Sequence, residues 1–96
     1  MGADTFIQKS SGKTAKEAFI EAQRQASYEH GHGGYTGSIA EKQSIVNIQL
    51  PKGKDAIDYA YELINNGDER IEDKWGPAGC IHIEGDNYLF FGWASS

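Results

Sequence analysis

The pattern of apolar and polar positions in the first half of the chain predicts a strand followed by a helix. The strand covers residues 5–9 and ends at a Ser-Ser-Gly turn. The helix begins at Thr14, because Thr14 and Glu17 match a capping box, and it runs to about His30. Apolar residues, most of them small, recur along it at spacings of three and four, which permits close approach to a sheet. These residues are Ala15, Ala18, Phe19, Ala22 and Ala26.

The second half predicts a strand, a helix and a final hairpin. Residues 44–50 alternate as a strand closed by Pro51, with Val46, Ile48 and Leu50 on one face. Residues 54–66 form an amphipathic helix that ends at an Asn-Asn-Gly stop signal. Its expected apolar face consists of Ile57, Ala60, Tyr61 and Ile64. Residues 75–79 read as an irregular connector, and residues 80–84 and 88–94 as the two strands of a hairpin.

The last strand is apolar on both faces, which is typical of a central strand. Tyr88, Phe90 and Ala94 point one way, whereas Leu89, Phe91 and Trp93 point the other. The order β-α-β-α-β-β predicts an α+β fold, a two-layer sandwich with both helices on one face of a mainly antiparallel sheet of about four strands. Residues 5–9 are the expected edge strand, which could pair with a second copy as a homodimer.

Length and cysteine content narrow the class of protein. At 96 residues the chain forms a single domain, residues 1–96, and its 39% hydrophobic residues suffice for one core. The lone Cys80 cannot form an internal disulfide, and no signal peptide is apparent, so a cytoplasmic location is expected, the host cytoplasm if a phage encodes the chain. Since no apolar run approaches the length of a membrane helix, no membrane partner is expected.

The net charge of the chain distinguishes a nucleic-acid partner from a protein partner. The net charge of -5 argues against direct binding to a nucleic-acid backbone, because such proteins cluster Lys and Arg. Acidic residues follow the polar face of the second helix and residues 68–73, so an acidic surface that captures a host protein is one expectation.

Two glycine-containing stretches resemble nucleotide-binding motifs and fail on spacing. The Ser-Ser-Gly-Lys-Thr stretch at 10–14 lacks the first glycine of a phosphate-binding loop, since Ile7 occupies that position. In residues 31–37 the third glycine of a dinucleotide loop would fall at Thr36, and the stretch leaves a helix rather than opening one. No cofactor is therefore expected.

Metal and nucleophile chemistry find little support in the sequence. His30, His32 and His82 are the only imidazoles, and a His-x-His pair at a helix end is more typical of an exposed terminus than of zinc binding, so no metal is expected. Cys80 in an apolar hairpin is more typical of packing than of catalysis. We therefore expect no catalytic residue, although a small hydrolase or transferase that uses His32 with Glu41 stays a third and weaker hypothesis.

The glycine-rich segment 30–38 is the best functional candidate. Its glycines expose backbone amides that can bind an anion, and its polar side chains add donors and a ring for stacking. The expected ligand-binding residues are His32, Gly33, Gly34, Tyr35, Thr36, Ser38 and, for stacking, Trp93, with Trp75 as a second indole. An alternative of equal weight is a tight connector over the sheet with Tyr35 as its packing anchor.

Residues 28–42 carry a family resemblance. Their Gly-Tyr-Thr-Gly-Ser-Ile-Ala-Glu-Lys stretch resembles a pattern in a group of small uncharacterised proteins of bacteriophages and bacteria, and residues 12–19, 75–79 and 90–94 are also similar to that group. No assigned activity comes with the resemblance. A phage-like origin implies counter-defence or accessory roles, in which small proteins occupy a site or sequester a ligand.

These observations favour a non-enzymatic binding protein that takes an anionic small molecule, such as a signalling nucleotide, through the glycine-rich segment. The alternative is a protein that inhibits a host defence enzyme, of the anti-CRISPR or anti-restriction type, through its acidic surface. The two hypotheses differ in partner, either an anionic small molecule or a host protein.

Overall fold

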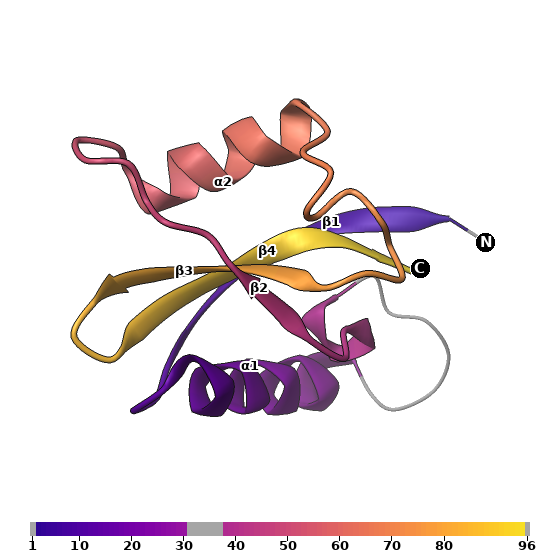
Figure 1. Ribbon diagram of the computed structural model, residues 1–96. Coiled ribbons are helices and arrows are strands. Elements are labelled where there is room, and N and C mark those ends of the chain that lie inside the picture. The colour runs from indigo at the N-terminus through magenta and orange to yellow at the C-terminus, as the bar shows by residue number, and fades with distance from the viewer. Residues whose placement is uncertain (1, 31–37, 96) are drawn as a thin grey trace.

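The fold consists of one four-stranded sheet between two helices (Figure 1). It comes from a computed structural model, which describes residues 2–30 and 38–95. In chain order the elements are β1 (Ala3–Ser11), α1 (Ala15–His30), the short 3-10 helix η1 (Ile39–Glu41), β2 (Ile45–Asn47), α2 (Ala56–Asn65), β3 (Ala78–Glu84) and β4 (Asn87–Ser95). The predicted α+β class and the predicted order β-α-β-α-β-β are confirmed.

The sheet has the order β1-β4-β3-β2 and is mixed rather than mainly antiparallel. β4 lies in the interior between β1 and β3 and pairs antiparallel with both, as its two apolar faces predict. β2 runs parallel to β3, because α2 connects them as a crossover and a crossover returns the chain in the same direction. β1 is an edge strand, as predicted.

The prediction that both helices cover one face is wrong. α1 lies on one side of the sheet and α2 on the other (Figure 1). The physical reason is the composition of β4, whose two faces are both apolar and therefore both need a cover. Phe90 packs with α1, whereas Leu89 and Phe91 pack with α2.

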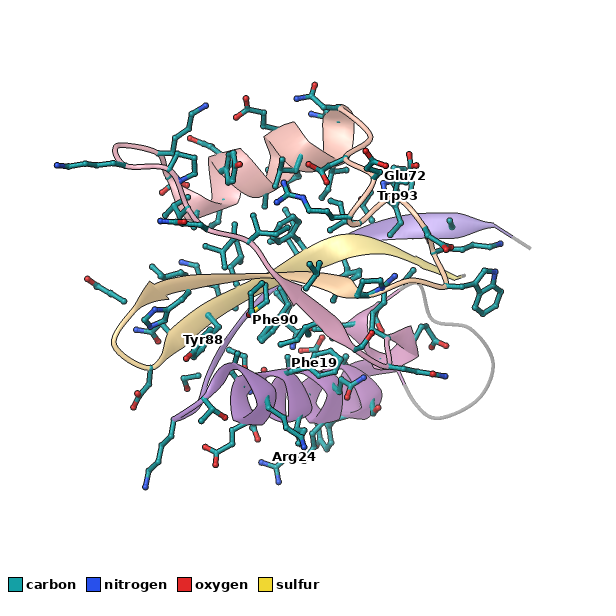
Figure 2. The ribbon with its side chains drawn as sticks, in the orientation of Figure 1. Phe19, Arg24, Glu72, Tyr88, Phe90 and Trp93 are labelled. Carbon is teal, nitrogen blue, oxygen red and sulfur yellow. The ribbon has the colours of Figure 1, made fainter. Side chains whose placement is uncertain are left out.

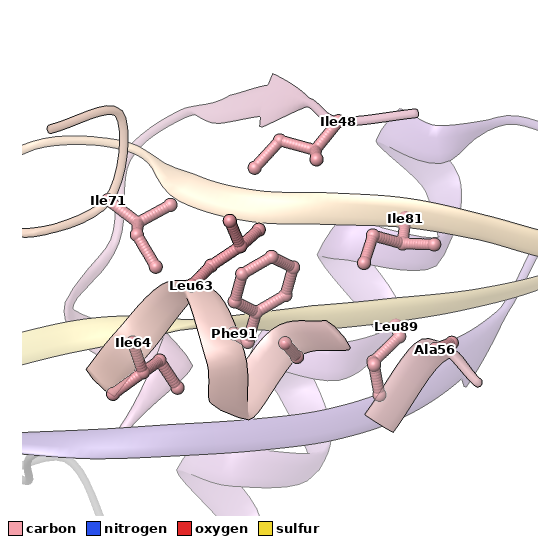
Figure 3. Packing of buried hydrophobic residues seen from close by; sticks show 9 residues of the cluster. Ile48, Ala56, Leu63, Ile64, Ile71, Ile81, Leu89 and Phe91 are labelled. Carbon is pink, nitrogen blue, oxygen red and sulfur yellow. The ribbon is translucent and has the colours of Figure 1, made fainter. Parts of the chain in front are cut away.

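Two hydrophobic clusters hold these layers together. On the α1 face, small residues of the helix let Phe19 approach Phe90, with ring centroids 5.8 Å apart (Figure 2). On the α2 face, Leu63 and Ile64 pack over Phe91 and Ile81 (Figure 3). The helix presents Leu63 where Tyr61 was expected, and Tyr61 is about half exposed. One cluster on each face replaces the single core that a two-layer fold would have.

Local signals set the helix ends. The Thr14 hydroxyl accepts the Glu17 amide at 3.2 Å, and the Glu17 carboxylate accepts the Lys13 amide at 3.1 Å rather than the amide of Thr14 itself. α2 begins after Asp55, whose Oδ2 accepts the amides of Ile57 and Asp58.

The strand boundaries differ from the prediction, since β1 and β4 extend further at both ends, β2 is shorter and β3 begins earlier. β2 is only three residues long and has β3 as its one partner among the described strands. β3 begins at Ala78, so Ala78 and Gly79 belong to the sheet and not to a connector. Gly79 permits this, since a Cβ there would lie 2.7 Å from Cζ of Phe91.

Candidate functional site

Most of the predicted ligand-binding residues lie outside the described part of the chain. His32, Gly33, Gly34, Tyr35 and Thr36 fall in the segment 31–37, so their predicted roles stay predictions. The same holds for the pairing of His32 with Glu41. Ser38 and Trp93 are described.

Ser38 is the first described residue after the glycine-rich segment. It is buried and precedes η1, and its Oγ accepts the amide of Ala40 at 3.3 Å. Ile39, which follows it, is fully buried in the cluster on the α1 face. Ser38 therefore caps η1 and fixes the point at which the glycine-rich segment rejoins the core.

Trp93 lies on the other face of the sheet. It packs against the cluster beneath α2, and Figure 2 labels it on that side of the sheet. Since η1 packs on the α1 face, the sheet separates Trp93 from Ser38. The structure does not bring these two predicted ligand-binding residues together.

Lys42 is a buried residue that the sequence prediction missed. Only 3% of its surface is exposed, and its Nζ donates to the backbone carbonyls of Asp73, Lys74 and Gly76 at 3.0–3.2 Å. Burial lowers the pKa of the Lys42 ammonium, and the nearby Asp73 carboxylate partly opposes that effect. Lys42 thus ties the 73–76 turn to the end of η1.

Helix α1 is also hydrogen-bonded to the end of η1. The side-chain amide of Gln23 donates to the carbonyl of Lys42 and, at 3.3 Å, to that of Ile39. The end of η1 is therefore bonded to α1 on one side and to the 73–76 turn on the other.

The surface members of this corner are Trp75, which is exposed, and Lys74, which is half-buried. Trp75 is 61% exposed, and its amide donates to Oδ1 of Asp73 at 2.9 Å. The Lys74 ammonium lies 5.5 Å from the centre of the Trp75 ring and also donates to the Gly2 carbonyl at 3.4 Å. An indole and a cation therefore lie side by side on the surface.

We call the surface formed by Lys74, Trp75 and η1 the η1 corner. Its members come from segments more than 30 residues apart, and Lys42 joins them. An exposed indole can stack on a planar ring, and an adjacent ammonium can pair with an anionic group. The corner therefore offers two of the contacts that an anionic aromatic ligand requires.

A hollow in the surface of the described residues lies elsewhere. It has a volume of about 480 Å³ and opens beside the β3–β4 turn, between Ser11 and Asn87. Its lining combines a lysine, a glutamate and neutral polar groups, without an exposed aromatic ring. The η1 corner is the better candidate for ligand binding, because stacking on an indole and pairing with an ammonium do not require an enclosing cavity.

Cys80 and His82 do not form a nucleophile and base. Cys80 is 1% exposed, and burial raises the pKa of its thiol to about 11, which keeps it protonated at neutral pH. The exposed His82 packs against the Tyr88 ring in a tilted arrangement with centroids 4.8 Å apart, and its Nε2 lies 2.7 Å from the Gly85 carbonyl oxygen. Within residues 2–30 and 38–95, no group of three His, Cys, Asp or Glu side chains could hold a metal ion.

Several acidic residues of the proposed protein-binding surface are engaged within the chain. Glu62 pairs with Lys54 at 2.9 Å, and Asp68 pairs with Arg70 at 2.8 Å. The Arg70 guanidinium lowers the pKa of the Asp68 carboxyl. These contacts reduce the unpaired negative charge that a basic partner would meet.

Comparisons with known proteins give no match from which a function could be transferred. No family model, no curated protein and no solved structure matches the chain. Among the described helices, none has both the length and the apolar composition needed to cross a membrane.

Proposed function

We propose that the protein is a non-enzymatic binding protein for an anionic small molecule that carries an aromatic ring, such as a signalling nucleotide. One observation carries the proposal, namely the attachment of Lys74 and Trp75 to η1 through the buried Lys42. This attachment presents an indole and an ammonium next to the end of the glycine-rich segment.

The chemistry of a nucleotide fits these groups. Stacking of a base on an aromatic side chain contributes about 1–3 kcal/mol, and an ammonium pairs with phosphate oxygens. The glycines of residues 31–37 would add backbone amides for the same phosphate. Of the two indoles considered from the sequence, Trp75 replaces Trp93 in this proposal, because Trp93 packs on the opposite face of the sheet.

The proposed biological role rests on the resemblance of residues 28–42 to a pattern in small proteins of bacteriophages and bacteria. A small protein that sequesters a signalling nucleotide would block a defence response that depends on that nucleotide. We therefore propose counter-defence by ligand capture in the host cytoplasm.

Native mass spectrometry with a mixture of cyclic and linear nucleotides tests the proposal. We expect one bound species at stoichiometric occupancy, with binding weakened at least about tenfold in Trp75→Ala and in Lys74→Ala. Lys52→Ala, which changes an exposed lysine in the turn before α2, is the matched control and should bind normally. A spectrum without ligand, or binding that survives Trp75→Ala, would refute the proposed site.

A second pair of substitutions tests the glycine-rich segment separately. Gly33→Ala together with Gly34→Ala should abolish binding and leave the thermal unfolding of the chain nearly unchanged. Binding that persists in this variant would assign the segment the role of a connector.

A further inference from the structure

Strand β1 offers a long edge for pairing. It spans nine residues and pairs with β4 over its whole length without a bulge. Proline is absent from it, and Asp4 and Lys9 are its only charged residues, so it has few of the features by which edge strands avoid another chain.

The register shows which backbone groups of β1 face outward. Gly12 donates its amide to the Asp86 carbonyl at 3.0 Å, which makes these two a hydrogen-bonded antiparallel pair. Because such pairs alternate along the ladder, the even-numbered residues of β1 bond to β4. The odd-numbered residues, 3 to 11, direct their amides and carbonyls to the open edge.

We propose that β1 pairs antiparallel with β1 of a second copy, about a two-fold axis through Ile7. Ile7 is the midpoint of the strand, so this register pairs all nine residues of each copy. It also matches outward-facing residues only with one another, Ala3 with Ser11, Thr5 with Lys9 and Ile7 with itself. Two four-stranded sheets then become one continuous sheet.

The side chains favour this register over its neighbours. The two-fold axis is perpendicular to the sheet, so each face of β1 meets the same face of the second copy. In the Ile7 register Asp4 is opposite Ser10 and Lys9 is opposite Thr5, so no like charges are opposed along β1. An axis through Lys9 would oppose the two Lys9 ammonium groups, and an axis through Thr5 would pair residues 3–7 only.

Ser10 is compatible with the proposed register. It is directly opposite Asp4 of the second copy, on the same face, so a neutral hydroxyl and not a second charge meets that carboxylate.

Helix α1 adds an aromatic contact near the axis. Gln8 of β1 donates to the Ala22 carbonyl at 3.0 Å and contacts Gln25 at 3.4 Å, so this side of α1 borders β1. Tyr28 lies one turn beyond Gln25 on the same side of α1 and is 91% exposed. Pairing of β1 brings the two α1 helices together across the axis, where the Tyr28 rings become covered.

Mass measurement in solution tests the dimer. Sedimentation velocity over a range of concentrations should give twice the chain mass for the wild-type protein. Thr5→Pro removes an outward amide without breaking a bond to β4, so it should raise the dissociation constant at least about tenfold, because symmetry removes two hydrogen bonds. Thr5→Ala keeps the amide and should remain dimeric. A wild-type monomer at every concentration, or a dimer unaffected by Thr5→Pro, would overturn the proposal.

Disulfide trapping tests the register and does not depend on Thr5→Pro folding well. Paired residues in a hydrogen-bonded antiparallel pair have Cα atoms about 5.5 Å apart, within the range of a disulfide. The double variant with Thr5→Cys and Lys9→Cys should form a covalent dimer on oxidation, whereas each single variant should stay monomeric under denaturing conditions. Cross-linking of a single variant would place the axis at that residue and overturn the Ile7 register.

Discussion

At the scale of single residues, Lys42 shows how a buried cation can organise a surface. Its aliphatic stem is covered and its three hydrogen-bonding positions are all used on backbone carbonyls. Such a lysine is costly to bury, and the bonds to carbonyl oxygens offset the cost. The local sequence around it, Glu-Lys-Gln, gives no sign of burial, so only the fold reveals its role.

Replacing Lys42 with Met should therefore destabilise the protein. The substitution keeps the apolar stem but removes the ammonium donor from the carbonyls of Lys74 and Gly76 and leaves the Asp73 carbonyl with only the Gly76 amide, and we expect a loss of about 2–4 kcal/mol in the free energy of unfolding. Urea denaturation measures this loss. Lys52→Met, at an exposed position, is the control and should change stability by less than about 0.5 kcal/mol. Equal effects of the two substitutions would contradict the role of Lys42.

Cys80 makes the stability depend on pH in the alkaline range. Its thiol has a pKa of about 11 when folded and 9.0 as the ordinary value, so between these values the unfolded chain loses the proton first. The sign follows directly, because the folded state binds more protons and stability must fall as the pH rises. The contribution of Cys80 is fully present below pH 9 and disappears as the pH passes about 11.

Thermal or urea unfolding between pH 8 and pH 11 checks this prediction. Relative to Cys80→Val, the wild-type protein should lose up to about 2–3 kcal/mol over this range. The difference between the two proteins removes the contribution of other titrating groups. Parallel pH profiles would show that the thiol ionises equally in both states.

At the scale of elements, the junction of β1 and α1 depends on Gly12. A Cβ at this position would lie 2.6 Å from the backbone nitrogen of Ala18 and 3.0 Å from the carbonyl carbon of Glu17. The glycine that resembles part of a phosphate-binding loop is therefore required by the close approach of the turn to the helix. Its amide also bonds to the Asp86 carbonyl at the tip of the hairpin.

Gly12→Ala should consequently be more harmful than an alanine at an open glycine. We expect a loss of about 2–4 kcal/mol, because backbone atoms must move apart to admit the methyl group. Gly53→Ala is the comparison, since nothing lies within 4 Å of its Cβ position and only its φ of 83° is strained, for a cost of about 1 kcal/mol. Equal losses in the two variants would show that the turn at Gly12 adjusts freely.

The elements themselves were predicted correctly from the sequence, whereas their layering was not. The apolar run of β4 and the capping box at Thr14 are local patterns, and local patterns determine strands and helix ends. The placement of α2 depends on which face of the sheet the chain crosses, and the periodicity of α2 itself does not record that. The two apolar faces of β4 did contain the necessary signal, because one covered face would have left Leu89 and Phe91 exposed.

At the scale of the whole molecule, the candidate site shows the limit of reading a sequence. Ser38 and Trp93 were grouped because their side chains suit a ligand, and the sheet separates them. The η1 corner instead depends on contacts between Lys42 and residues more than 30 positions away. Contacts at such separation have no sequence pattern, so the corner could be found only once the chain was folded.

The proposed dimer predicts an alternating pattern of amide exchange along β1. In a monomer, the amides of Thr5, Ile7 and Lys9 face solvent and exchange fast, while those of Phe6 and Gln8 are bonded to β4 and exchange slowly. In the dimer, both sets are bonded, so the odd-numbered amides should become protected as the protein concentration rises, and the even-numbered amides should change little. Hydrogen exchange followed by NMR at two concentrations, on either side of the dissociation constant, measures this difference for each residue. Odd-numbered amides that still exchange fast in a sample shown by its mass to be dimeric would place the interface away from β1. Odd-numbered amides protected only in the dimer would establish β1 as the surface through which the molecule doubles its sheet.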